Sequence, residues 1–148
     1  MSLIEQIETE LTAALKSGEN FTRDTLRLLK SSLKNAEIEA GKALDDEQTV
    51  SIIQKEVKKR VEAETLFNQA GKPDLAANEA AEAKLLKKYL PEQMGEDEIK
   101  AVVTEYLSSN PTEIGQMGTA MGVLSAKLKG QADMGLVSKI LREQIQNG

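Results

Sequence analysis

The residues of this sequence best suited to hold a ligand lie in a glycine- and lysine-rich run, residues 117–139. Gly118 and Gly122 interrupt a strong helical pattern there, and glycine inside a helix costs about 0.5–1 kcal/mol relative to alanine. With Ser125 and Lys129 they follow the spacing i, i+4, i+7, i+11, which places all four on one helix face. The spacing predicts a groove almost without side chains that leads to a lysine.

Two interpretations of this glycine groove remain open from the sequence. Small residues allow neighbouring helices to approach closely, so Gly118 and Gly122 could serve packing inside the protein. Alternatively, the groove faces outward and receives a phosphate backbone or a partner helix. The two uses are compatible if one glycine faces inward and the other outward.

A basic turn follows the groove. Lys127, Lys129 and Lys139 surround Gly130, which we expect to end one helix, while Asp133 is expected to cap the start of the next. The free N–H groups and positive dipole end of that next helix could hold a phosphate. The alternative is that Lys127 and Lys129 only complement the dipole at the end of their own helix.

A second group of basic residues lies near the N-terminus. Its members also follow the spacing i, i+4, i+7, i+11 and form a continuous edge on one predicted helix: Arg23, Arg27, Lys30 and Lys34. Such an edge is either a solvated face whose long side chains cover the rim of the core, or a ridge that contacts RNA. RNA binding through phosphate neutralisation would weaken steeply with salt.

Most enzyme chemistries are excluded by composition. The chain has no cysteine and no histidine, which removes cysteine nucleophiles, Ser-His pairs and the common zinc sites. Its carboxylates accompany no nucleophile and no glycine-rich phosphate loop. We therefore expect no catalytic, cofactor-binding or metal-binding residues and no intrinsic enzymatic activity.

The elements that carry these residues are expected to be helices throughout, because apolar residues recur with helical period and no stretch alternates like a strand. We predict an N-terminal helical domain, residues 1–92, in which the third and fourth helices form a hairpin around Gly71. The buried face of the third helix is expected to carry Val50, Ile53, Val57 and Val61. Residues 93–148 are expected to form a small tail domain of three helices.

The overall charge and hydropathy suggest where in the cell the protein is located. The 148 residues carry a net charge of -5, which favours solubility and restricts any nucleic-acid contact to a local patch. No stretch approaches the roughly 20 apolar residues of a membrane span, and the first residues lack the pattern of a signal peptide. We expect a cytoplasmic protein that does not insert into a membrane.

The chain resembles the YqeY family over its whole length. In the N-terminal part, the resemblance rests on Arg27-Leu-Leu-Lys30 and on Tyr89-Leu-Pro-Glu-Gln-Met94. The C-terminal motif is more specific and also resembles the tail of the B subunit of glutamine-dependent aminoacyl-tRNA amidotransferase; it consists of Met117-Gly118, Met121-Gly122, Lys127, Lys129-Gly130, Ala132-Asp133 and Val137.

This resemblance implies a helical domain followed by a helical tail that engages tRNA, in association with a carbon–nitrogen ligase system but without an active site of its own. Carried over by position, the tRNA-facing residues would be Gly118, Gly122, Lys127, Lys129 and Gly130. Two positions depart from the family pattern. Gln131 stands where a basic residue is usual, and Met134 separates the aspartate from Gly135. Both departures weaken the phosphate-turn interpretation.

Three functions are therefore considered. The leading hypothesis is a non-catalytic, tRNA-associated or amidotransferase-like accessory protein that recognises RNA shape and backbone. The alternative is a protein-interaction module whose methionine and glycine surface receives a partner helix. DNA binding by the last two helices ranks third, because the final helix offers only Lys139 and Arg142 as basic residues.

Overall fold

The computed structural model describes all residues, 1–148, and contains seven α-helices and one short 3-10 helix but no strand. The prediction of an all-α protein is thereby confirmed. The chain divides into two compact units, Met1–Leu90 and Pro91–Gly148. Each unit has its own hydrophobic core, so each is described separately.

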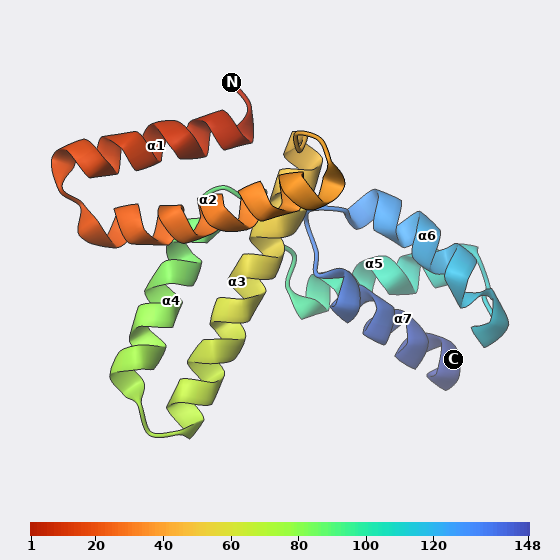
Figure 1. Ribbon diagram of the computed structural model, residues 1–148. Helices are drawn as coiled ribbons and strands as arrows, with labels where there is room; N and C mark the ends of the chain where they lie inside the picture. The colour runs from red at the N-terminus through yellow and green to blue at the C-terminus, as the bar shows by residue number, and fades with distance from the viewer. The chain divides into compact units, whose positions relative to one another are not determined.

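The first unit begins with two helices that lie side by side, α1 (Leu3–Ser17) and α2 (Asn20–Ala40) (Figure 1). Ser2 and Glu5 form a capping box that satisfies backbone N–H groups at the start of α1. Gly18 and Gly41 follow the two helices with left-handed φ values of 76° and 69°. Glycine favours this conformation, so both residues suit the end of a helix.

The next two helices, α3 (Asp46–Gln69) and α4 (Pro73–Lys87), form the predicted hairpin and make the most extensive helix–helix contact in the chain (Figure 1). Asp45 and Gln48 form a second capping box at the start of α3. Pro73 occupies the first turn of α4, where its missing N–H costs nothing. Local sequence thus favours the start of each helix of the hairpin.

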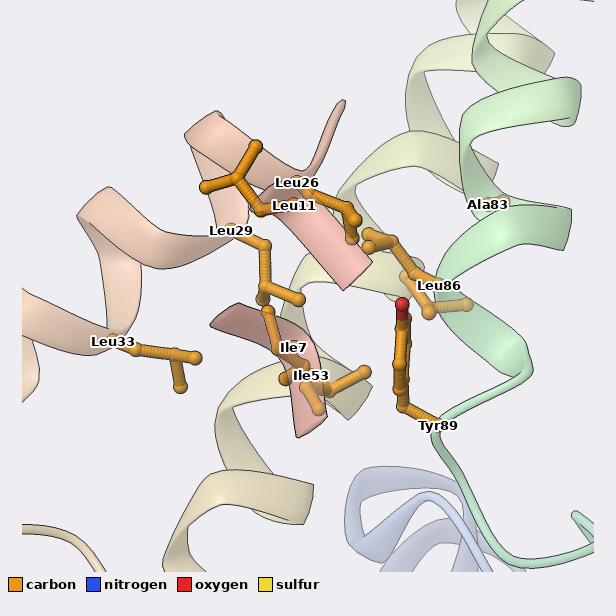
Figure 2. Close-up of a cluster of buried hydrophobic side chains, with 10 residues drawn as sticks. Ile7, Leu11, Leu26, Leu29, Leu33, Ile53, Ala83, Leu86 and Tyr89 are labelled. Atoms are coloured by element: carbon orange, nitrogen blue, oxygen red, sulfur yellow. The ribbon is translucent and has the colours of Figure 1, made fainter. Parts of the chain in front are cut away.

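The core of the first unit joins all four helices. Figure 2 shows its buried side chains, contributed by α1, α2, α3 and the C-terminal end of α4: Ile7, Leu11, Leu26, Leu29, Leu33, Ile53, Ala83, Leu86 and Tyr89. The Tyr89 hydroxyl donates a hydrogen bond to the carboxylate of Glu10 on α1. Burial raises the pKa of Tyr89, and the hydrogen bond and charge of Glu10 raise it further. This tyrosine therefore ties the segment after α4 to α1 as a neutral hydrogen-bond donor.

The prediction that Val61 is buried is wrong. Val57 is the last residue of α3 in the core cluster, whereas Val61 is exposed. The physical reason is the neighbouring Arg60, which turns into the hairpin instead. Its guanidinium lies 2.8 Å from the carboxylate of Glu56 and 3.3 Å from that of Glu82 on α4. A buried ion network thus continues the contact between α3 and α4 beyond the apolar core.

The second unit consists of α5 (Glu96–Ser109), the 3-10 helix η1 (Ile114–Gln116), α6 (Met117–Leu128) and α7 (Met134–Asn147). Its three α-helices share a core in which nine residues are buried: Ile99, Val103, Ala120, Leu124, Leu128, Ala132, Val137, Ile140 and Leu141. Gln144 connects α7 to α5, because its amide accepts a hydrogen bond from Thr104 and donates one to the carbonyl of Lys100.

Candidate binding surface

Helix α6 has one apolar side and one unusually small, uncharged side. Ala120, Leu124 and Leu128 are buried in the core of the second unit. The opposite side of the helix is exposed and carries no charged residue; we call it the α6 face, and it consists of Gly118, Thr119, Gly122, Val123 and Ala126. The solvent side of a globular helix is normally charged or polar. The α6 face therefore departs from what solubility alone would select.

Both glycines of the α6 face border open space. A Cβ atom added at Gly118 or Gly122 would meet no atom within 4 Å beyond the local backbone. Neither glycine has a positive φ. The interpretation that these glycines allow close packing within the fold is therefore wrong. The sequence could not distinguish the two cases, because a row of small residues has the same spacing whether it faces a neighbour or solvent.

Positive charge lies next to the α6 face. Lys127 and Lys129 are exposed at the C-terminal end of α6, where Lys129 is the C-cap residue. No acidic residue occurs from Ile114 to Ala132, although the whole chain carries 24 acidic residues. The two lysines thus form a local positive region in an acidic protein.

The turn after α6 is held by a segment distant in sequence. Gly130 adopts a φ of 78°, a left-handed conformation that favours glycine. Its carbonyl accepts a hydrogen bond of 2.8 Å from the side chain of Gln93, and the N–H of Met94 donates one of 2.7 Å to the carbonyl of Gln131. The sequence did not predict this contact. Gln93 and Gly130 are 37 residues apart, so no local pattern indicates that they meet.

The start of α7 is occupied by its own cap. Asp133 is the N-cap residue, as predicted, and its carboxylate accepts a hydrogen bond of 3.1 Å from the N–H of Gly135. A negative carboxylate at this position competes with a phosphate for the same N–H groups. The structure therefore argues against a phosphate site at the start of α7. Lys139 is exposed further along this helix.

The N-terminal basic edge is partly neutralised within the first unit. Arg23 forms an ion pair of 2.8 Å with its neighbour Asp24, and Lys30 lies 3.9 Å from Glu8 on α1. The hydrogen bond from Arg23, helped by the charges of Arg23 and Arg27, lowers the pKa of Asp24 despite some desolvation. Arg27 and Lys34 are exposed on α2. A shallow pocket of about 280 Å³ lies beside this edge, lined by Ile4, Ile7, Glu8, Lys30, Leu33, Lys34 and Glu37.

None of the helices combines the length and the apolar character needed to cross a bilayer.

The fold and the α6 face together define an all-helical protein of two units with a candidate macromolecule-binding surface. Comparison with known families then identifies the chain. The model of the family described as "Yqey-like protein" matches residues 4–145, and the chain belongs to this YqeY family.

Several curated fungal proteins are similar to this chain, and three of them are named "Altered inheritance of mitochondria protein 41, mitochondrial". The protein of Clavispora lusitaniae is 30% identical over 109 residues, which cover 72% of this chain and 64% of the relative. That of Pyrenophora tritici-repentis is 27% identical over 146 residues, covering 97% and 81%. The protein of Lachancea thermotolerans is 30% identical over 116 residues, covering 74% and 62%.

The chain thus spans less than two thirds of the length of the Clavispora and Lachancea relatives. Their names also correct one prediction. The expectation of a cytoplasmic protein is contradicted, because all three relatives are named mitochondrial proteins. Composition could not reveal this, since net charge and hydropathy constrain solubility but do not specify a compartment.

Proposed function

We propose that this protein is a non-catalytic accessory protein that binds tRNA through the α6 face and the adjoining lysines, Lys127 and Lys129. The observation that carries the proposal is the open space over Gly118 and Gly122. A helix surface without long side chains allows a sugar-phosphate backbone to approach the helix closely. The two lysines would neutralise phosphates at one end of the contact.

Family resemblance supports the same surface. The motif that resembles the tail of the amidotransferase B subunit contains both glycines of the α6 face and both lysines. In this structure the motif covers α6, the turn that follows it and the start of α7, and the side chain of Gln93 donates a hydrogen bond to the carbonyl of Gly130 in that turn. The motif thus combines an open surface with a fixed basic end, which suits recognition of RNA shape rather than base sequence.

The proposal is tested by measuring the affinity for total tRNA across a salt series. We expect Lys127→Glu combined with Lys129→Glu to weaken binding by at least about tenfold at low salt and to flatten the salt dependence. Lys72→Glu combined with Lys42→Glu is the matched control, because it makes the same charge change at exposed positions in the first unit. Equal loss in both double variants, or no tRNA binding by the parent at low salt, would contradict the proposal.

A specific observation also favours a second candidate, the docking of a protein helix on the α6 face. Val123 is 48% exposed on this face, and Ile114 is 53% exposed in the 3-10 helix just before α6. Large apolar side chains beside a small-residue groove suit a partner helix better than a phosphate backbone. Under this alternative, Val123→Ser would abolish partner binding, whereas the lysine double variant would not.

A further inference from the structure

Helix α2 has a second apolar row that the core does not use. Leu26, Leu29 and Leu33 are buried between α2 and its neighbours. On the opposite side of the helix, three large apolar side chains remain exposed to solvent; we call them the α2 outer row, and they are Phe21 (44% exposed), Leu28 (55%) and Ile38 (70%).

The α2 outer row follows one side of the helix, with polar residues between its members. At about 100° per residue, the three members fall within an arc of about 100°, and the same arc also contains the exposed residues Asp24, Ser31, Asn35 and Glu39. From Phe21 to Ile38 the row runs for about 25 Å at 1.5 Å per residue. Scattered exposed apolar residues need no explanation, but an aligned row of this length matches one face of a partner helix of about five turns.

A row of positive charge follows one edge of this apolar surface. Arg23, Arg27, Lys30 and Lys34 lie on the flank of α2 beside the α2 outer row. Asp24 and Glu39 are acidic residues within the arc of the row, and Arg23 pairs with Asp24 at 2.8 Å. The contact of Lys30 with Glu8 spans 3.9 Å, and both side chains are 49% exposed, so it neutralises little.

The α2 outer row and the basic edge beside it together fit one kind of partner. An RNA backbone would bind the basic edge but would leave three large apolar side chains without contact, and Phe21 is the one aromatic residue among them. An anionic membrane surface is broad enough to bring lipid phosphates against Asp24 and Glu39 as well as against the basic edge. A helix with leucine-like residues on one face and glutamate or aspartate along the adjoining edge would satisfy both rows at once.

We propose that the outer side of α2 is a docking site for an acidic amphipathic helix of a partner protein. The α2 outer row contacts the apolar face of that helix, and Arg27, Lys30 and Lys34 pair with its carboxylates. This site lies in the first unit and is independent of the α6 face. It assigns to the N-terminal basic edge a protein contact in place of the RNA contact considered from sequence.

Site-directed photo-crosslinking of the full chain tests this site. Benzoylphenylalanine replaces Ser31, which lies in the middle of the α2 outer row, and crosslinking is done in cells that produce the protein. We expect a protein adduct whose attached peptide belongs to an acidic amphipathic helix. The same probe at Thr12, an exposed position on α1, is the control.

Two double variants then separate the contributions of the two rows. Leu28→Ala with Ile38→Ala, and Arg27→Glu with Lys34→Glu, should each reduce the yield of this adduct by about tenfold or more. All four positions are exposed, so circular dichroism should show an unchanged fold. The proposal is overturned if the adduct is RNA, lipid, a second copy of this chain or a non-acidic protein segment, if neither double variant lowers its yield, or if Ser31 yields no more protein adduct than Thr12.

Discussion

Arg60 is the centre of the buried ion network in the α3–α4 hairpin, with contacts of 2.8 Å to Glu56 and 3.3 Å to Glu82. Removing the guanidinium would leave two largely buried carboxylates without their counter-charge. We therefore expect Arg60→Ala to lower the free energy of unfolding by about 2–4 kcal/mol, measured in urea. Lys59→Ala is the control, because Lys59 is highly exposed although it lies 3.5 Å from Glu56. Similar small effects of both substitutions would contradict the network's structural role.

The contribution of Glu56 to the stability of the fold should depend on pH. Burial raises its pKa, but hydrogen bonds from Arg60 and Ser32 and the charges of Lys59 and Arg60 outweigh burial and hold the pKa below the ordinary value of a glutamate. A lowered pKa in the folded state stabilises the fold above the unfolded pKa, and this contribution is lost as the pH falls. Glu56→Gln should therefore destabilise the protein at neutral pH, by a margin that shrinks in acid.

The contribution of Glu82 to stability should change with pH in the opposite direction to that of Glu56. Burial and the nearby charge of Glu79 raise its pKa, although Arg60 partly offsets them. Its contribution to stability is therefore present below the unfolded pKa and is lost as the pH rises through the folded pKa. The stability of Glu82→Gln relative to the parent should increase from acid to neutral pH. Parallel pH profiles for Glu56→Gln and Glu82→Gln would contradict this assignment.

Arg60 directly follows Lys58 and Lys59, and nothing in this run of basic residues indicates that the arginine is buried. The reason is physical: a charged residue joins a core only when carboxylates from elsewhere reach it, and Glu82 lies on another helix. The same limit applies to the contact between Gln93 and Gly130. Local patterns do not contain partners that only the fold brings together.

The helices themselves were largely predictable. Gly18 and Gly41 follow α1 and α2, and Asp45 caps α3, because capping depends on residues within one turn of the helix end. The buried Leu124 and Leu128 of α6 also follow helical spacing. Helical spacing could not determine whether the glycines of α6 are exposed, because their exposure depends on where α5 and α7 pack.

The openness of the α6 face leads to a prediction about this helix. Gly118 and Gly122 have helical backbone conformations and open space at the Cβ position. Gly118→Ala and Gly122→Ala should therefore each stabilise the second unit by about 0.5–1 kcal/mol, as judged by urea or thermal unfolding of the full chain.

Gly130→Ala is the informative comparison for these two substitutions. Because Gly130 has a φ of 78°, an alanine there should destabilise the turn by about 1 kcal/mol. If Gly118→Ala or Gly122→Ala were instead destabilising, the α6 face would be packed against another part of the protein. If both substitutions are stabilising, Gly118 and Gly122 lower the stability of the second unit relative to alanine.

Across the whole molecule, acidic and basic residues are distributed unevenly. The net charge of -5 disfavours indiscriminate binding to polyanions, yet residues 114–132 contain two lysines and no acidic residue. The tRNA contact that we propose is therefore confined to this surface.

The most direct test is the tRNA affinity of Gly118→Leu combined with Gly122→Leu. A Cβ atom meets open space at both positions, and both residues are exposed, so the leucines should leave the fold intact while holding a nucleic-acid backbone away from the helix. We predict at least about tenfold weaker binding than that of the parent, with no change for the control Thr12→Leu on α1. An affinity within about twofold of the parent's, in a double variant with unchanged circular dichroism, would contradict the proposal that tRNA binds at this face.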